Sequence, residues 1–293
     1  LPLSPGGRWG GRTAPAGQTI LQVEGGNANL RPERASNFSA SLVLHPRVLA
    51  GLNLSATYFK VVYRDRIAIP SVSAAQILND PVYSSFVTAN PTSTEIADLL
   101  SMAPAGILDV TGANLPFDPA SVFAILDYRY TNIARDRAQG FDVSGSYAFD
   151  LTSRSKVTIH ASGTYLHSQR RVIDGLPSID LAGTIYYPPH FRVRGGIAFD
   201  RGALTINAIA NYIGGVRDNR LATQVEVEGM TSFDLAIKRQ FGSDRGVELQ
   251  INASNLFNAH PDRIRATGIN LPYDSANYSP IGRYVSISIS KAM

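Results

Sequence analysis

The sequence predicts an all-β protein, an antiparallel up-and-down transmembrane β-barrel present as a partial barrel of about nine strands with long external loops. In the segment that begins at Val247, odd-numbered residues to Ala253 are apolar, and even-numbered residues to Ser254 are polar. A period of two is that of a strand with one apolar and one polar face. Such runs recur and reach about ten residues, the length that a tilted strand needs to cross a bilayer.

Nine segments show strand character. In chain order they are residues 34–45, 52–67, 133–150, 155–168, 187–200, 203–214, 230–241, 246–256 and 281–291. The fifth to eighth alternate most clearly: Phe191, Val193 and Ile197 lie between Arg192, Arg194 and other polar or small residues. In the last segment, isoleucines alternate with serines. We therefore expect an apolar face against lipid and a polar face toward the lumen.

The connections between these strands alternate in length. Short ones are expected at residues 46–51, 151–154, 201–202 and 242–245, and long ones at 68–132, 169–186, 215–229 and 257–280. Outer-membrane barrels have short periplasmic turns and long external loops, so the short connections should share one rim. Strand parity further predicts that Lys238 lies opposite Glu248 or Gln250 and not opposite Leu249.

Aromatic residues are predicted to form two interfacial girdles. Beside the short turns lie Phe149, Phe199 and Phe241, and toward the long loops lie Tyr165, Tyr212, Phe257 and Tyr284. In the longest loop, Thr92 precedes apolar residues at helical spacing (Ile96, Leu99 and Leu100). This pattern predicts a short amphipathic helix over the barrel mouth, interpreted as packing the loop rather than contacting ligand.

The composition excludes several classes of protein. No run of about 18 apolar residues exists, which excludes a helical membrane protein. The absence of cysteine excludes disulfides, thiolate catalysis and zinc–thiolate sites. The net charge of +4 is spread without a basic tract and gives no support for nucleic-acid binding. The first 30 residues are rich in glycine and proline and lack a signal-peptide pattern, so we expect a piece of a longer chain.

Five stretches, in order, carry a resemblance to a known family. They are GGNANLRPE (residues 25–33), LSATYF with YRDRI (54–67), GFD (140–142), ASNLFN (253–258) and GRYVSISIS (282–290). Together they resemble the C-terminal portion of the β-barrel of TonB-dependent outer-membrane receptors. The barrels of that family have about 22 strands around a plug domain.

The resemblance implies that the chain holds the last nine strands of such a barrel. Residues 1–33 would be an external loop segment and residues 34–293 strands and loops, with the plug domain and N-terminal barrel strands absent. The chain departs from the family pattern at Met293, where outer-membrane proteins usually carry a terminal aromatic residue.

The function implied is that of a transporter rather than an enzyme. The complete protein would take up a scarce nutrient (a metal chelate, a cobalamin-like or an oligosaccharide ligand) across the outer membrane of a Gram-negative cell. Its partners would be outer-membrane lipid and lipopolysaccharide, the small-molecule nutrient, and a TonB-type energy-coupling complex acting through the missing plug. It would be a monomer without a cofactor. The alternative is a secreted soluble β-rich binding or carbohydrate-active module.

No catalytic, cofactor-binding or metal-binding residues are predicted, and the ligand-binding residues stay unknown. The histidines lack metal-site spacing: His45, His160, His167, His190 and His260. Six charged residues of the polar faces are interpreted as a lumen ladder rather than a catalytic set: Asp142, Asp234, Glu248, Arg192, Arg194 and Lys238. Six loop arginines could meet an anionic ligand, lipopolysaccharide phosphates or solvent: Arg170, Arg171, Arg217, Arg220, Arg263 and Arg265.

Overall fold

The computed structural model describes residues 8–9, 12–13, 18–70, 77–78, 81–103, 106–109, 116–220, 223–242, 246–265 and 271–291. The chain divides into two compact units. Unit 1 comprises Leu1–Arg34, Tyr63–Arg135 and Arg171–Ser178, and unit 2 comprises Ala35–Val62, Asp136–Arg170 and Ile179–Met293. Expectations for residues 243–245, 266–270 and Met293 lie outside the described residues.

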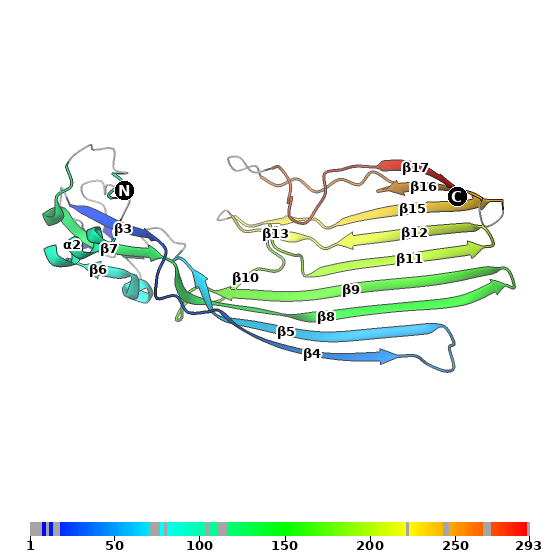
Figure 1. The fold of residues 1–293 in the computed structure, drawn as a ribbon, viewed down its shortest axis with the longest axis horizontal. Coiled ribbons are helices and arrows are strands. Elements are labelled where there is room, and N and C mark those ends of the chain that lie inside the picture. The colour runs from blue at the N-terminus through cyan, green and yellow to red at the C-terminus, as the bar shows by residue number, and fades with distance from the viewer. Residues whose placement is uncertain are drawn as a thin grey trace. The chain divides into compact units, whose positions relative to one another are not determined.

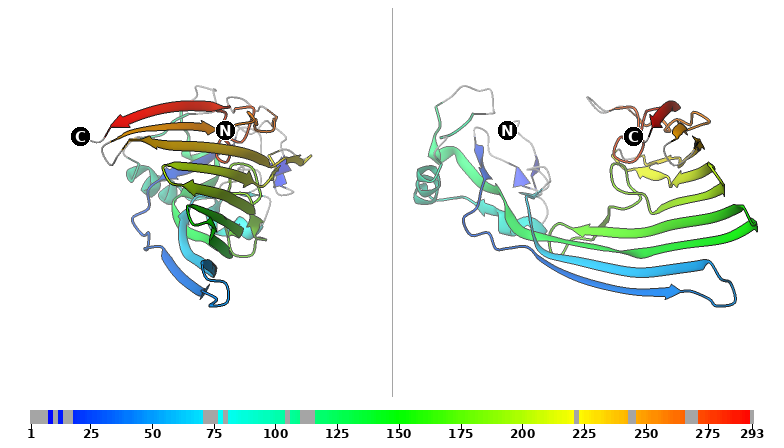
Figure 2. Two further views of the ribbon diagram at one scale, coloured as in Figure 1. Left: turned by 90° about the vertical axis from the view of Figure 1, so that its right-hand side faces the viewer. Right: turned by 45° about the vertical axis from the view of Figure 1, so that its right-hand side comes forward.

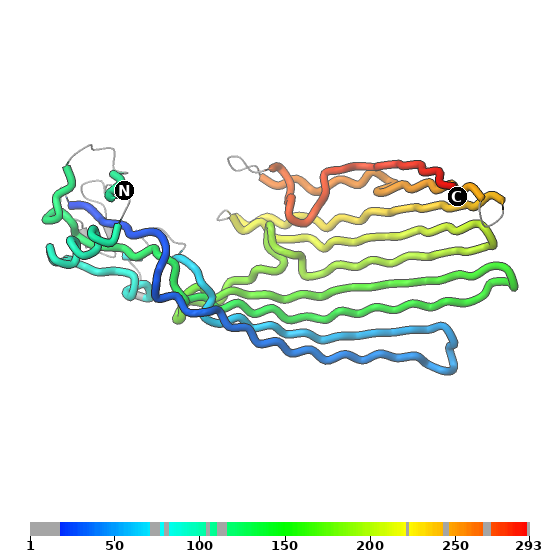
Figure 3. The backbone as a smooth tube through the Cα atoms, in the orientation of Figure 1, coloured from blue at the N-terminus to red at the C-terminus, as the bar shows by residue number. Residues whose placement is uncertain are grey.

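Unit 2 is built on one large sheet whose strands follow one another in chain order (Figure 1). Its strands are β4 (Arg34–Leu44), β5 (Leu52–Ala68), β8 (Thr131–Thr152), β9 (Ser155–Arg171), β11 (Phe191–Arg201), β12 (Leu204–Ile213), β15 (Met230–Phe241), β16 (Val247–Ser254) and β17 (Tyr284–Lys291). The short β10 (Ile179–Asp180) pairs with β9. The backbone trace runs up and down through these strands in chain order, and between β5 and β8 it passes through unit 1 (Figure 3). All nine predicted strands are confirmed.

Two strands begin later than the sequence pattern suggests. The fifth starts at Phe191 rather than at 187, because Pro188 and Pro189 lie just before it and have no N–H to give to a ladder. The last starts at Tyr284 rather than at 281, after Pro280 and Gly282. In both places proline or glycine precedes the observed start of the strand.

The short connections share one end of the sheet, as expected (Figure 1). Arg201 pairs with Leu204 across one turn and with Ser155 of β9 on its other side. Phe241 pairs with Val247 at the same end. Tyr212 pairs with Val193, so it lies at the opposite end from Arg201. The predicted sidedness is confirmed.

The predicted register is also confirmed. Lys238 is paired with Gln250, and Leu249 is paired with Arg239 on the other face. The Lys238 Nζ atom lies 3.6 Å from Oε2 of Glu248, one residue pair along the same face. Both side chains are more than a third exposed, so this ion pair contributes no more than about 1 kcal/mol to stability.

The apolar face of the sheet is exposed over its whole width. Large side chains on it include Phe38 (59% exposed), Ile197 (52%) and Ile289 (72%), on β4, β11 and β17. A continuous apolar surface of this extent is far larger than that of soluble monomers. The sheet curves into an open arc with β4 and β17 as its edges (Figure 2, left).

The aromatic girdles are present with one correction. Phe199 pairs with Ile206, and Tyr165 pairs with Phe191, so these rings lie on the apolar face at opposite ends. Phe257 stacks edge-on against Phe233 of that face, with ring centroids 5.3 Å apart. Tyr284, in contrast, pairs with Ser254 on the polar face. The expectation that Tyr284 belongs to the girdle is wrong, because its parity is that of Ser286 and Ser288.

Unit 1 has its own small sheet and core. Strand β3 (Thr19–Gly25) pairs in parallel with β7 (Val122–Arg129), and β6 (Val87–Ala89) pairs antiparallel with β7. Two 3₁₀ helices (Pro81–Phe86 and Pro119–Ser121) and helix α2 (Ser93–Ser101) complete it. The segment 1–33, expected to be loop, therefore contains strand β3 and, nearer the N-terminus, two short strands. Unit 1 also has the short hairpin of β1 (Arg8–Trp9) with β2 (Arg12–Thr13). In unit 2, β13 (Val216–Asp218) pairs with β14 (Val225–Val227).

Helix α2 confirms the helix predicted from the sequence. Thr92 caps it through a reciprocal capping box: its hydroxyl accepts from the Glu95 N–H, while the Glu95 carboxylate accepts from the Thr92 N–H at 2.7 Å. Ile96 is 1% exposed and packs with Val122 and Ile125 of unit 1. The helix therefore packs the loop; its predicted place over a barrel mouth stays a prediction. Within the described residues, no helix is both long and apolar enough to cross a membrane.

Candidate functional site

The polar face of the unit 2 sheet holds a cavity of about 680 Å³. Residues of β5, β8, β9, β11, β12 and β15 line it together. Six strands can border one cavity only where the sheet curves toward it, so the polar face is the concave one. The uncharged polar lining side chains include Ser55, Thr57, Ser144, Ser162, Asn211 and Ser232.

Three charged residues of the predicted lumen ladder line this cavity. Arg192 and Arg194 lie two residues apart on one face of β11, and Asp142 lies on β8. The Asp142 carboxylate accepts a hydrogen bond of 2.6 Å from the Thr164 hydroxyl. The Arg192 guanidinium donates through Nη2 to Oδ1 of Asn277, at 2.7 Å.

The other three ladder residues share this face on neighbouring strands. Asp234 pairs across from Ile209, and its carboxylate accepts from Nδ2 of Asn211 and from the backbone N–H of Asn255. Lys238 and Glu248 form the ion pair described above. The structure thus places all six predicted residues on one polar surface and joins them mainly to amides and hydroxyls. Within the described residues, no three His, Asp or Glu side chains gather as a metal site would require.

Three long connections of unit 2 pack together through the segment that precedes β17. The fully buried Asp274 accepts from the N–H groups of Tyr186 and Ala276 and from Nδ2 of Asn277. The Tyr278 hydroxyl donates to the Gly214 carbonyl at 2.8 Å. Burial, together with the nearby Asp274 charge, raises the pKa of Tyr278 to about 12. We call residues 271–283 the loop strap, since it binds the connection before β11, at Tyr186 and Tyr187, and the connection after β12, at Gly214.

Most of the loop arginines have structural partners that the sequence could not reveal. Arg220 forms a bidentate pair with Asp218 (2.8 and 2.7 Å) and donates to the Arg265 carbonyl. The Arg220 guanidinium holds the pKa of Asp218 below its usual range. Arg217 pairs with Glu226 at 3.0 Å. Two more pairs join Arg170 to Asp136 at 2.8 Å and Arg171 to Asp174 at 4.0 Å. Four of the six arginines are therefore engaged in ion pairs.

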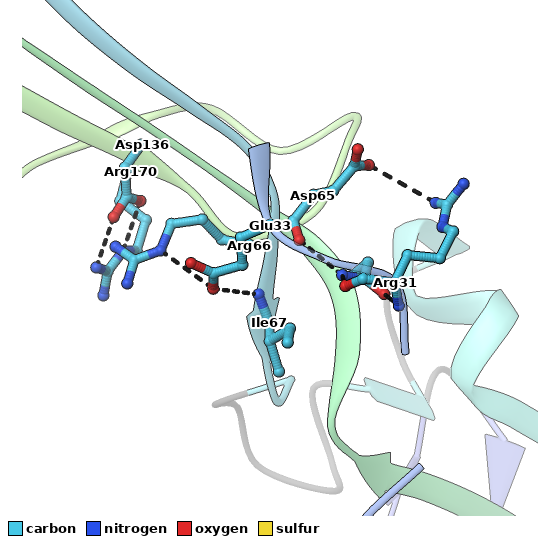
Figure 4. A network of polar contacts seen from close by, with 8 residues as sticks. Arg31, Glu33, Asp65, Arg66, Ile67, Asp136 and Arg170 are labelled. Carbon is cyan, nitrogen blue, oxygen red and sulfur yellow. Dashed lines mark hydrogen bonds and ion pairs between the residues drawn. The ribbon is translucent and has the colours of Figure 1, made fainter. Parts of the chain in front are cut away.

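The GGNANLRPE stretch forms a polar brace in unit 1 (Figure 4). Glu33 accepts from the Ile67 N–H at 2.9 Å and lies 3.6 Å from Arg66 of the same strand. The Asn132 side chain accepts from the Arg31 N–H and donates to the carbonyls of Arg31 and Asp65. These bonds fix the chain as it enters β4 against β5 and β8. The stretch thus has a structural role at the start of β4.

The NLFN stretch has a similar role at the end of β16. Asn255 adopts a left-handed backbone (φ 49°), and its side chain bonds both the N–H and the carbonyl of Ala259. Asn258 (φ 59°) accepts from the Arg283 N–H at 2.8 Å. A Cβ on Gly282 would lie 2.3 Å from that same Asn258 oxygen, so any larger residue there would displace the Asn258 side chain. The two asparagines thus end β16 and position the start of β17.

An apolar outer face, a polar concave face, short turns at one end and long loops at the other together define a β-barrel protein of the outer membrane. A family model described as TonB dependent receptor-like, beta-barrel, matches residues 3–256. The chain belongs to the family of TonB-dependent receptors and is a protein of the Gram-negative outer membrane. No curated protein sequence matches it.

Solved structures of this class share the fold. The outer membrane transporter YddB from Escherichia coli aligns with a TM-score of 0.54 at 10% identity, over 94% of this chain and 34% of that one. The siderophore receptor PirA from Acinetobacter baumannii aligns with a TM-score of 0.55 at 16% identity, over 91% and 32%. The ferric enterobactin receptor PfeA from Pseudomonas aeruginosa gives 0.53 at 13%, over 91% and 32%. The chain spans about a third of the length of these structures.

Proposed function

We propose that this chain forms part of the barrel wall of an outer-membrane receptor that takes up a scarce nutrient by TonB-dependent, energy-coupled transport. The single observation that carries the proposal is the two-faced sheet: large apolar side chains cover the outer face, and a hydroxyl- and amide-lined cavity lies on the inner face. Such a wall gives lipid one surface and a passing solute the other. Family membership supports transport over catalysis.

The complete receptor would contain the plug and the remaining barrel strands, which this chain does not include. Its ligand would be a small nutrient: a metal chelate, a cobalamin-like molecule or an oligosaccharide. The relatives named above, a siderophore receptor and a ferric enterobactin receptor, support a chelate among these classes. The energy-coupling complex would act through the plug, and the receptor would be a monomer with lipid and lipopolysaccharide around its apolar face.

The soluble binding module is disfavoured by the exposed outer face. Ile287 and Ile289 of β17 are 66% and 72% exposed, and Ile251 lies beside Ile287 on the adjoining strand. A soluble protein with this surface would aggregate. Purification therefore offers a simple check: the full receptor should partition with membranes and need detergent to remain dispersed.

Energy coupling is tested by uptake in a Gram-negative host that lacks its own receptors for the nutrient. Cells expressing the full receptor should accumulate one of a panel of radiolabelled ferric chelates, cobalamin or oligosaccharides. Deletion of the host TonB protein, or collapse of the proton gradient, should abolish accumulation while surface binding continues. Uptake that persists in the deletion strain would instead identify a passive pore.

A further inference from the structure

The apolar outer face of the sheet carries two exposed arginines at its short-turn end. Arg201 of β11 and Arg239 of β15 both pair with Leu204 of β12, so the three residues form one row across neighbouring strands. The row continues to Ser155 of β9 and Leu249 of β16. Neighbouring strands are about 4.8 Å apart, so the two arginine Cα atoms lie about 10 Å apart with Leu204 between them. Every strand that borders this pair belongs to the chain.

Charges of opposite sign are separated between the two faces here. The acidic residues within the bounds of β9, β11, β12, β15 and β16 are Asp200, Asp234 and Glu248. All three have the parity of the inner face. Within these described strands the outer face therefore has no carboxylate, whereas its short-turn end carries two guanidinium groups. The charged group that this end of the face attracts is an anion.

The Arg239 side chain turns toward the edge of the membrane. Its guanidinium carbon lies 5.2 Å from the centroid of the Phe241 ring, and Phe241 is two residues nearer the short turn. Phe199 lies on the same face, two residues before Arg201. Interfacial aromatic rings of this kind lie at the level of the lipid headgroups. The stem of Arg239 thus covers apolar surface while its charge reaches the depth of the headgroup phosphates.

Apolar side chains continue from this row toward the middle of the sheet. The next two rows of the outer face on these three strands are wholly apolar: Phe199, Ile206 and Ile237, then Ile197, Ala208 and Leu235. Such a surface suits acyl chains, and the two guanidinium groups suit a phosphate at their end. A phospholipid joins these two parts in one molecule.

We propose that Arg201 and Arg239 together bind the phosphate of an anionic phospholipid of the periplasmic leaflet, over Leu204. The planar fork of each guanidinium matches phosphate oxygens. Two guanidinium groups on one phosphodiester leave a positive charge in excess, which favours phosphatidylglycerol over a zwitterionic headgroup. Lipopolysaccharide is not the occupant, because the external leaflet lies at the end of the long loops. This inference rests on the outer-membrane location and not on transport.

The test compares two lipids with identical acyl chains, dimyristoyl phosphatidylglycerol and dimyristoyl phosphatidylcholine. Native mass spectrometry of the full receptor in non-ionic detergent would measure the binding of each lipid. Phosphatidylglycerol should bind about ten-fold more tightly, since its headgroup has no cation to repel the arginines. Arg201→Gln and Arg239→Gln should each lower the affinity for phosphatidylglycerol about ten-fold. Arg239→Lys should lower it less, because it keeps the charge and loses only the fork.

The matched control is Lys156→Gln, which removes a positive charge at the same end of the sheet but on the inner face, opposite Asp200. It should leave the affinity for phosphatidylglycerol unchanged. Excess inorganic phosphate, which lacks acyl chains, should not displace the lipid. Heat-modifiable mobility would verify the folding of each variant, and the comparison of the two lipids needs no variant.

Three results would each overturn the site: equal affinity for the two lipids, displacement by inorganic phosphate, or unchanged affinity in both arginine-to-glutamine variants. The proposed function is tested separately. Failure of the unaltered receptor in the uptake assay would contradict transport and leave the lipid site standing, while uptake that continues in variants without lipid binding would leave transport standing.

Discussion

Asn255 shows how a single side chain can shape the backbone at the end of a strand. Its side chain closes a loop onto the backbone of Ala259, and its backbone has a left-handed φ of 49°, which asparagine tolerates better than most residues. Its own N–H is bonded to Asp234 of β15. The family-like NLFN stretch thus has a structural role in the local backbone geometry.

We predict that Asn255→Ala lowers the free energy of unfolding of the full receptor by about 2 kcal/mol. The reason is the loss of two side-chain hydrogen bonds, each contributing about 1 kcal/mol, and the poorer fit of alanine to a left-handed backbone. Guanidinium unfolding in detergent would measure it. Asn53→Ala is the matched control, because Asn53 is an exposed strand residue; an equal loss in both variants would contradict the assigned role.

At the scale of elements, the loop strap joins connections that are distant in sequence. Asp274 bonds the backbone at Tyr186, and Tyr278 bonds the Gly214 carbonyl, so residues separated by 88 and 64 positions are tied together. The Tyr278 hydroxyl donates this hydrogen bond only in its protonated, neutral form. Deprotonation would remove the donor and bring a second negative charge near Asp274.

The raised pKa of Tyr278 gives the strap a pH dependence. Because the folded-state pKa is about 12 and the unfolded value about 10, folding favours the protonated phenol. The stabilisation is fully present below pH 10 and is lost as the pH rises through 12. A difference titration at 295 nm between the unaltered receptor and Tyr278→Phe should therefore show the missing phenol ionising near 12. If the phenol that Tyr278→Phe removes ionised near pH 10 instead, the burial of this hydroxyl would be contradicted.

The sequence predicts the strands of this protein far better than it predicts the contacts between residues that are distant in the chain. Alternation is a local signal, so all nine strands, the position of the turns and the placing of Lys238 opposite Glu248 or Gln250 rather than Leu249 could be derived from parity. The parallel pairing of β3 with β7 joins residues about 100 positions apart and leaves no local trace. The same holds for Asp136 with Arg170 and for Arg192 with Asn277. Candidate site residues could be assigned to a face, but not to a cavity or to a partner.

At the scale of the whole molecule, the sheet has two unsatisfied edges. Its neighbours run in one path from β17 to β4, and within the described residues neither of these strands has a second partner in the sheet. Each edge strand leaves a row of N–H and C=O groups unpaired. In hydrocarbon each such group costs several kcal/mol, so an open arc cannot rest stably in a bilayer. Further strands must cover β4 and β17 in the assembled barrel.

We therefore predict that residues 1–293, expressed alone behind a signal peptide, form no closed barrel and transport nothing. Closure of these nine strands on themselves would bring the charged inner residues of β11 toward the opposite wall of a narrow lumen, at a high desolvation cost. Folded outer-membrane barrels migrate differently on gels before and after boiling, so the isolated chain should show no such shift, whereas the full receptor under the same conditions should. An isolated chain that is heat-modifiable and also takes up a nutrient would show that nine strands suffice, and would contradict the assignment of this sheet as one part of a wider wall.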